Sequence, residues 1–287
     1  MKKISELLER GTSLSVELWP PRSHDAQERL ENVLTELYPL HPTFTSITYG
    51  AGGSTRERTH DLVVRIAREG LITPMAHLVC AAHSRSELVD ILVRYRDEGV
   101  NNILALMGDP PLNATAPLER GDLMHAIELA ELAREVGDFC VAVAAHPEGH
   151  PLSPDMESDR NYLAGKLEVS DFAITQFFFD ADHYFRLVDD LSARGIDKPI
   201  LPGIMPITKI RTVHKMAELS GTRVPPDLAE RVERVADRPD EVRKIGVEVA
   251  IDLARRLLAG GVPGLHFYTM NESAATIEIV NALSYAH

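Results

Sequence analysis

The sequence predicts an α/β protein, a single (β/α)8 TIM barrel over residues 1–287 with an extra helix inserted before the last long helix. Eight strand-like runs alternate along the chain with amphipathic helical patterns, as strand–helix–strand units do. Several of these runs are apolar almost throughout, which is typical of parallel strands covered by helices. Eight such units in 287 residues fit a closed barrel better than an open, doubly wound sheet.

Each predicted strand is a short run rich in apolar and β-branched residues that ends near glycine, proline or a polar side chain. The runs cover residues 13–19 (SLSVELW), 44–50 (FTSITYG), 74–80 (PMAHLVC), 102–109 (NILALMGD), 140–148 (CVAVAAHPE), 172–180 (FAITQFFFD), 199–206 (PILPGIMP) and 264–271 (GLHFYTMN).

The predicted helices carry apolar residues at helical spacing, and several of them close with glycine. They cover residues 28–38, 59–69, 86–99, 122–137, 184–195 and 241–261. The stretch 220–241, rich in charge and proline, is the predicted extra helix with its loops. The run YGAGGS at 49–54 lacks the G-x-G-x-x-G spacing of a dinucleotide-binding fold, and no P-loop sequence occurs.

Composition narrows the partners to small molecules. The formal net charge of −13 argues against a general affinity for nucleic acid or for an anionic membrane. Cys80 and Cys140 are too few for a disulfide framework or a cysteine-built metal site. The N-terminal stretch is charged and amphipathic rather than a signal peptide, and no run approaches the roughly 20 apolar residues of a membrane span. We expect a cytoplasmic protein.

Polar side chains recur where the predicted strands end, and in a barrel those ends meet at one rim. They are Glu17, Thr48, Tyr49, His77, Asp109, His146, Glu148, Gln176, Tyr268 and Asn271. Each alone has a plainer interpretation, Asp109 as a turn residue and His77 as a satisfied core histidine. Gln176 closes an apolar strand, where its amide needs partners that a polar ligand could supply. Their convergence favours an active site.

The segment AAHPEGHP places His146 and His150 on either side of Glu148, a grouping that invites a metal site. The prolines prevent a regular helix from presenting both histidines on one face. Nothing in the sequence supplies the third protein ligand that zinc requires. We therefore expect no metal.

Glu17 raises a separate question, because SVELWPP carries an acid into an apolar strand beside Leu18 and Trp19 and then stops at two prolines. An unpaired carboxylate is costly to bury, so such an acid is expected to be partnered, protonated or used.

These segments, taken in order, resemble methylenetetrahydrofolate reductase of the bacterial type that consists of the barrel alone. The resemblance rests on SVELWPP, SITYGAGGSTRERT, AHLVC, ILALMGDPP, AAHPEGHP, ITQFFFD, PGIMPI and LHFYTMN, which run over nearly the whole chain.

The resemblance implies one catalytic domain that reduces 5,10-methylenetetrahydrofolate to 5-methyltetrahydrofolate with a reduced nicotinamide, a step of one-carbon metabolism that feeds methionine synthesis. It makes Glu17 the acid that protonates folate N10 and places Asp109 near the pterin. A carboxyl whose pKa is raised by apolar neighbours keeps its proton near neutral pH. The implied substrate-binding residues are Gln176, Tyr268 and Thr212. The implied cofactor-binding residues are Thr48, Tyr49, Ala51, His77, Gly108, His146, Asp159 and Lys166.

The sequence departs from the family pattern at the flavin contacts. Met107 replaces an arginine, His146 a tyrosine and Gly165 a second basic residue, and Gly121 stands near an expected aromatic residue. We therefore expect that FAD binds weakly or not at all and that NADH passes hydride directly to the folate. NADPH as reductant stays open, as do the FAD-dependent version of the reaction and a non-catalytic barrel that binds folate or a nucleotide.

Two more departures concern the glutamate tail of the folate. Glu272 stands where the family commonly has arginine, and Thr212 where it has glutamine. Another cation would have to meet the tail, and Lys209 and Arg211 are candidates by position. A Schiff-base lyase is disfavoured, because no lysine closes a predicted strand.

Overall fold

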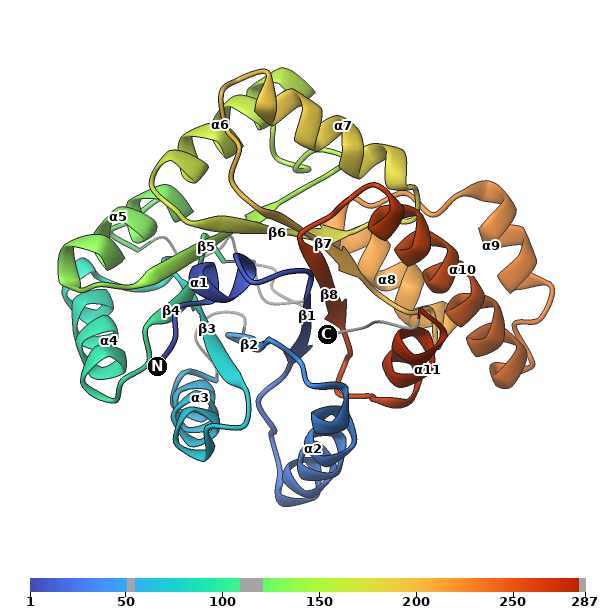
Figure 1. Cartoon of the computed structure of the whole chain (residues 1–287), viewed down its shortest axis with the longest axis horizontal. Helices are drawn as coiled ribbons and strands as arrows, with labels where there is room; N and C mark the ends of the chain where they lie inside the picture. The colour runs from blue at the N-terminus through green and yellow to red at the C-terminus, as the bar shows by residue number, and fades with distance from the viewer. Residues whose placement is uncertain (51–54, 109–120, 284–287) are drawn as a thin grey trace.

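Eight parallel strands close into a barrel in the computed structural model, which describes residues 1–50, 55–108 and 121–283. Each strand pairs with the next along the chain, and the last pairs with the first (Figure 1). The strands are β1 (Ser13–Leu18), β2 (Phe44–Ile47), β3 (Thr73–Val79), β4 (Asn102–Leu106), β5 (Cys140–Ala145), β6 (Phe172–Phe177), β7 (Ile200–Ile204) and β8 (Gly264–Tyr268). The predicted (β/α)8 barrel is confirmed.

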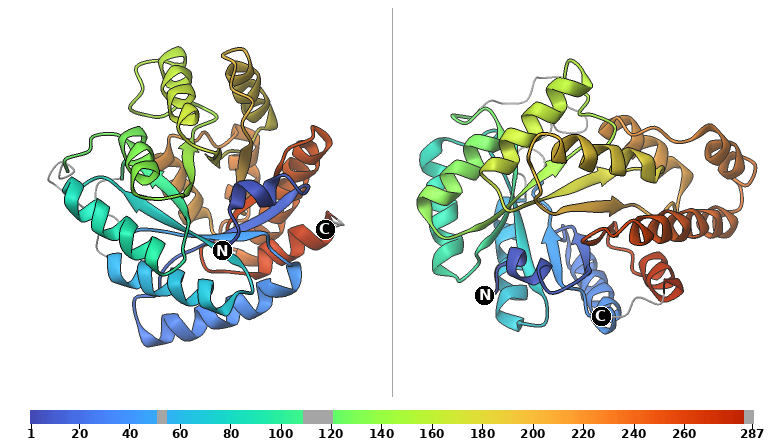
Figure 2. Two further views of the ribbon diagram at one scale, coloured as in Figure 1. Left: turned by 60° about the vertical axis from the view of Figure 1, so that its left-hand side comes forward. Right: turned by 45° about the horizontal axis from the view of Figure 1, so that its top comes forward.

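Helices surround the barrel on its outer side, except the first, which covers its N-terminal end (Figures 1 and 2). They are α1 (Ile4–Leu8), α2 (His24–Leu37), the short 3-10 helix η1 (Tyr38–Leu40), α3 (Arg56–Glu69), α4 (Arg85–Asp97), α5 (Ala126–Val136), α6 (Met156–Glu168), α7 (Ala181–Ser192), α8 (Ile210–Ser220), α9 (Pro226–Glu233), α10 (Pro239–Ala259) and α11 (Ala274–Ala282). Helix α9 is the predicted extra helix, and α10 is the long helix that follows it.

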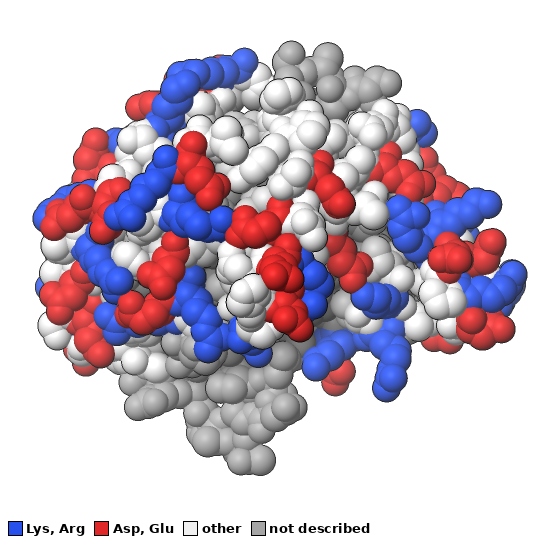
Figure 3. All heavy atoms as spheres, turned by 90° about the horizontal axis from the view of Figure 1, so that it is seen from below, with Lys and Arg blue, Asp and Glu red and all other residues white. Residues whose placement is uncertain are grey.

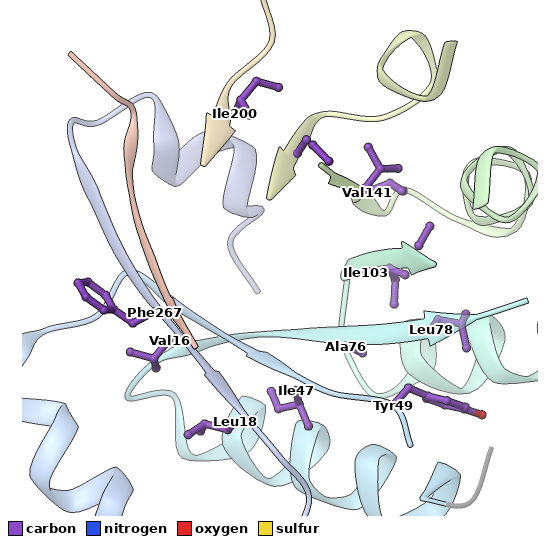
Figure 4. Close-up of a cluster of buried hydrophobic side chains, with 14 of the residues drawn as sticks. Val16, Leu18, Ile47, Tyr49, Ala76, Leu78, Ile103, Val141, Ile200 and Phe267 are labelled. Atoms are coloured by element: carbon purple, nitrogen blue, oxygen red, sulfur yellow. The ribbon is translucent and has the colours of Figure 1, made fainter. Parts of the chain in front are cut away.

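Strand alternation gives the barrel two chemically different faces, because successive side chains point to opposite sides of a strand. Residues of one parity pack outward against the helices, for example Val16 and Leu18 on β1. Figure 4 shows part of this layer, in which Ile47, Ala76 and Leu78 follow on β2 and β3. Residues of the other parity face the interior of the barrel, and Glu17 is one of them.

The N-terminal end of the barrel is filled by apolar side chains and covered by α1 (Figure 1). Ile4 and Leu8 from α1 join a separate buried cluster with interior residues such as Phe44 and Phe172. The Ile4 backbone N–H also donates a 2.8 Å hydrogen bond to Asn102 Oδ1. The barrel is therefore closed at this end, so a ligand has to enter from the opposite, C-terminal end.

The strands end earlier than the sequence runs suggest. β2 stops at Ile47, β4 at Leu106 and β5 at Ala145, so the polar residues that follow them lie in loops. The cause is local, because glycine and proline follow within a few residues and interrupt the ladder of hydrogen bonds. These loops carry Thr48, Tyr49 and His146 to the rim of the barrel.

Acidic and basic side chains are interspersed on the face of the molecule in Figure 3. On this face, such mixing of the two signs avoids a large field of one sign. Among the described helices, none is long and apolar enough to cross a membrane.

Candidate active site

One cavity of about 350 Å³ opens at the C-terminal ends of the strands. It is lined by residues from β1, β3, β4, β5, β6 and β8, from the loops that follow β2, β3, β4, β5 and β8, and from α5 and α6. Nine of the residues that the sequence singled out line it together: Glu17, Thr48, Tyr49, His77, Gly108, His146, Lys166, Gln176 and Tyr268. The structure therefore brings these nine residues together at one rim of the barrel. Asp109 and Ala51 lie outside the described residues.

Glu17 points into this cavity from the end of β1, with 12% of its side chain exposed. Desolvation by burial is the main cause that raises the pKa of Glu17 to about 7. The indole N–H of Trp19 donates a 3.3 Å hydrogen bond to Glu17 Oε1, which lowers the pKa by a smaller amount. The carboxyl can thus hold a proton near neutral pH, as the sequence argument required.

Two buried histidines lie on the neighbouring interior positions of the barrel. His77 on β3 places Nε2 3.7 Å from Glu17 Oε2. His266 on β8 lies deeper, with Nδ1 2.8 Å from Ser15 Oγ and Nε2 3.5 Å from Ser46 Oγ. Burial lowers the pKa of each histidine to about 3, so both are neutral.

His266 is a cavity residue that the sequence reasoning missed. Its signal was present, because His266 has the same parity as Tyr268 on a strand whose other residues pack outward. His83 is a second residue that the sequence analysis did not single out. Its Nε2 lies 3.0 Å from the hydroxyl of Tyr49.

The ends of β1 and β8 are joined next to Glu17. Asn271 accepts a 2.8 Å hydrogen bond from the Trp19 N–H and donates a 3.0 Å bond to the Trp19 carbonyl. The Thr269 hydroxyl donates to the Glu17 carbonyl at 2.6 Å. The two prolines after Trp19 end the pairing of the strand. The hydrogen bonds from Asn271 and Thr269 therefore hold the backbone on either side of the acid in place.

Tyr268 is held by its hydroxyl, which donates a 2.7 Å hydrogen bond to the Thr175 carbonyl. Gly203 on β7 makes room for this ring, because a Cβ there would lie 2.5 Å from Tyr268 Cε2. Gln176 lies beside it and accepts a 3.0 Å bond from the Phe177 N–H through Oε1. Its amide nitrogen is the part of the side chain left to offer hydrogen bonds to a ligand.

His146 and His150 both line the cavity, with ring centroids 4.5 Å apart at 79°. Burial is the largest cause that lowers the pKa of His146 to about 3. Glu148 does not join them. Its carboxylate accepts from the Arg223 N–H at 3.2 and 3.3 Å instead. Within the described ranges, no group of three or more histidine, cysteine or acidic residues could hold a metal ion.

Asp159 lies apart from the cavity, and protein donors occupy its carboxylate. Oδ1 accepts from the His150 N–H at 2.8 Å and from Ser153 Oγ at 3.0 Å, and Oδ2 accepts from Arg160 at 2.8 Å. Lys166 reaches the cavity from α6 and donates a 2.7 Å bond to the Ala144 carbonyl. Burial lowers the pKa of Lys166 to about 8.

These contacts test whether the described residues suit a resident flavin dinucleotide, the cofactor that the family resemblance brings with it. Among the described lining residues, Lys166 is the only lysine or arginine that could meet a pyrophosphate. At Gly121, a Cβ would lie 2.2 Å from the His83 carbonyl oxygen, so no side chain fits there as the loop stands. The described part of the site is poorly suited to FAD.

A second pocket of about 160 Å³ adjoins the cavity and shares Met270 with it. Thr212 lies here rather than in the main cavity, together with Trp19, Lys209 and Glu272. Lys209 Nζ forms a 2.5 Å ion pair with Glu272 Oε1. Of the two cations suggested for the folate tail, Lys209 thus lines a pocket and already has an acidic partner.

Comparison with known proteins shows the family to which the chain belongs. The family model for methylenetetrahydrofolate reductase matches residues 2–284. The 5,10-methylenetetrahydrofolate reductase of Pectobacterium carotovorum subsp. carotovorum is 35% identical over 277 residues, 96% of this chain and 91% of that protein. The enzyme of the same name from Escherichia coli (strain K12) is 34% identical over 272 residues, 94% of this chain and 90% of that protein.

A solved structure from Clostridium thermocellum is similar in fold, with a TM-score of 0.67 and 13% identity over 98% of this chain and 96% of that one. It is described as an uncharacterized protein that binds two copies of 5-methyl-5,6,7,8-tetrahydrofolic acid. At this identity the likeness concerns the barrel alone. From the family model and the relatives, the chain belongs to the methylenetetrahydrofolate reductase family of oxidoreductases.

Proposed function

We propose that residues 1–287 form one catalytic unit that reduces 5,10-methylenetetrahydrofolate to 5-methyltetrahydrofolate, with NADH as the reductant and Glu17 as the proton donor. The observation that carries this proposal is the carboxyl of Glu17, which faces the cavity with its pKa raised to about 7. A folate-binding barrel without chemistry would have no use for a proton donor held in this way.

The reaction needs one proton and one hydride. Glu17 gives its proton to folate N10, and the bond between N10 and the methylene carbon breaks, leaving an iminium on N5. Hydride from the nicotinamide then adds to that carbon and makes the methyl group. General acid catalysis of this kind is most effective when the pKa of the acid lies near the working pH. Gln176 is placed to hydrogen-bond the pterin or the nicotinamide amide.

A direct transfer from NADH is supported by the poor fit of the described residues to a resident flavin. Protein groups already occupy the Asp159 carboxylate, and Lys166 alone among the described lining residues brings a basic side chain. NADH also carries two phosphates, but it binds and leaves in each turnover, so it needs weaker contacts to them than a resident flavin dinucleotide does. In this form of the reaction, folate and NADH occupy the site together.

The first experiment is an absorption spectrum of the purified protein combined with initial-rate kinetics. We expect no flavin bands, no flavin released on denaturation, and intersecting rate patterns that indicate a ternary complex. Flavin bound in stoichiometric amount, together with parallel rate patterns, would establish the FAD-dependent version of the reaction instead.

The second experiment replaces the acid. Glu17→Gln should abolish NADH oxidation by methylenetetrahydrofolate while the affinity for 5-methyltetrahydrofolate, measured by calorimetry, changes little. The reason is that an amide keeps the size and polarity of the side chain but has no acidic proton to transfer. Glu248→Gln on the exposed side of α10 is the matched control and should keep full activity. Unchanged turnover in Glu17→Gln would remove this residue from the mechanism.

A non-catalytic barrel that binds folate or a nucleotide is the competing function. It predicts tight binding of the same ligands without NADH oxidation in the unaltered protein. The same assay therefore decides between the two functions. The role of Asp109 near the pterin stays a prediction, and Asp109→Asn with the same two measurements tests it.

A further inference from the structure

His77 lies in the interior of the barrel on β3, next to the acid on β1. It is 6% exposed, and its Nε2 is 3.7 Å from Glu17 Oε2. Nε2 is buried and has no hydrogen-bond partner among the described residues. A buried polar atom without a partner is unusual and asks for a physical reason.

We propose that His77 is a positioning residue that donates a hydrogen bond from Nε2 to the carboxylate that Glu17 becomes during the reaction. The inference rests on the proposed function, because it concerns the proton transfer from Glu17 to folate N10. In that step the O–H bond of Glu17 breaks, its electron pair stays on the carboxylate, and the proton moves to N10. His77 keeps its own proton throughout.

The two oxygens of Glu17 face different groups, which is why the second oxygen depends on His77. Trp19, directly after β1, donates to Oε1. On β8, the Tyr268 hydroxyl is directed to the Thr175 carbonyl, and His266 is hydrogen-bonded to serine side chains. On β2, the residue paired with Glu17 is the neutral Ser46. Among the described groups, His77 is thus the donor available to Oε2.

A neutral histidine suits this task better than a charged one. A cationic imidazole next to Glu17 would lower the pKa of the carboxyl and remove its proton before the substrate is bound. Burial lowers the pKa of His77 to about 3, so the ring is uncharged at any pH at which the enzyme works. An uncharged donor stabilises the carboxylate after proton transfer while leaving the acid protonated beforehand.

The separation of 3.7 Å is longer than a hydrogen bond, so the two groups are close but not bonded in the ligand-free structure. Such contacts are often long in ligand-free enzymes and shorten when charge develops. Hydrogen bonds to charged acceptors are also shorter and stronger than those between neutral groups. The contact therefore strengthens at the moment when Glu17 becomes ionised.

The test measures the pKa of Glu17 directly by NMR of protein labelled with ¹³C at the glutamate carboxyl carbon, with Glu17→Gln to assign the signal. His77→Leu removes the donor and leaves an apolar side chain of similar size. His77→Gln returns an N–H close to the position of Nε2. His60→Leu is the matched control, because His60 on α3 is also buried, its ring nitrogens have no hydrogen-bond partner among the described residues, and its Nδ1 likewise lies near an acid, 3.6 Å from Asp61 Oδ1, but outside the cavity.

His77→Leu should raise the pKa of Glu17 by about 1 and lower kcat about tenfold, with KM for the folate unchanged within about twofold. His77→Gln should restore the pKa of Glu17 to within about 0.5 and kcat to within about threefold of the unaltered protein. His60→Leu should leave the pKa of Glu17 where it is. An unmoved pKa in His77→Leu, or a His77→Gln as impaired as His77→Leu, overturns the proposal.

A measurement on the unaltered protein covers the case in which the variants do not fold. The ¹⁵N chemical shifts of His77 in the complex with 5-methyltetrahydrofolate should identify the tautomer protonated on Nε2. Protonation on Nδ1 alone would refute the proposal. Both NMR measurements need no turnover, so a protein that fails to oxidise NADH refutes the proposed function and leaves this inference to be judged separately.

Discussion

At the residue scale, the position of Glu17 follows from strand parity. Val16 and Leu18 are buried against the helices, so the side chain between them has to face the barrel interior. The groups around it are neutral, with His77 beside it and His266 with its serine partners below, and an apolar cluster fills the N-terminal end of the barrel. Burial there destabilises the charged form of the acid, which explains how an apolar strand comes to carry a carboxyl that keeps its proton.

The same burial makes the stability of the protein depend on pH through Glu17. The pKa is raised from 4.5 to about 7 on folding, so the folded protein binds more protons than the unfolded chain between these values. Stability due to this group is therefore present below pH 4.5 and is lost as the pH rises through about 7.

Glu17→Gln should remove this pH dependence. We compare the free energy of unfolding of the variant with that of the unaltered protein. From pH 5 to pH 8, this difference should change by about 2–3 kcal/mol in favour of the variant. Urea unfolding at the two pH values measures the difference. If this difference is the same at pH 5 and pH 8, the pKa of Glu17 is not changed by folding.

At the element scale, the segment between β5 and α6 is fixed by one buried arginine. Arg160 on α6 has 3% of its side chain exposed and donates to the carbonyls of His146 and Pro147 at 3.0 and 2.8 Å. It also pairs with Asp159 at 2.8 Å. These bonds hold the backbone of His146 at the cavity, so α6 shapes the site through Arg160 as well as through Lys166, which lines it.

Arg160→Ala should lower the free energy of unfolding by about 3–5 kcal/mol, because it leaves the Asp159 carboxylate and two carbonyls without their partner. Arg231→Ala is the matched control, since its 3.0 Å ion pair with Glu248 is exposed. The control should cost less than about 1 kcal/mol. Thermal or urea unfolding of both variants compares the two, and equal losses would contradict the anchoring role of Arg160.

At the scale of the whole molecule, the apolar cluster that stabilises the barrel and the candidate active site lie at opposite ends. The N-terminal end is closed by α1 and the apolar cluster beneath it, whereas the cavity with Glu17 opens at the other end. Substitutions at the closed end should therefore change stability with little effect on ligand affinity.

Ile4→Ala tests this separation. Ile4 is fully buried, and its truncation should cost about 2–4 kcal/mol while KM for the folate stays within about twofold. Leu71→Ala, at a side chain that is 67% exposed, should cost no more than about 0.5 kcal/mol. Calorimetric melting and initial rates provide the two measurements. A large change in KM for Ile4→Ala would show that the two ends are coupled.

Local pattern was sufficient for the fold, since apolar runs in β/α alternation determine which faces must be buried. It was also sufficient to predict most of the residues that line the cavity. These residues, Glu17, His77, Gln176 and Tyr268, lie at or near the C-terminal ends of strands, and those ends meet in a barrel. It missed His266 and His83, whose significance depends on the side chains of nearby strands and loops that they contact.

The sequence by itself determined the barrel, the end at which the site lies and the family, because these follow from periodicity and from ordered motifs. Only the tertiary structure decided how the site residues are partnered. In that structure the Asp159 carboxylate accepts hydrogen bonds from protein donors, and Lys166 donates to the Ala144 carbonyl. His77 lies beside Glu17. The physical reason is that burial, hydrogen bonding and pKa depend on neighbours from distant segments, which closure of the barrel brings within a few ångströms of one another.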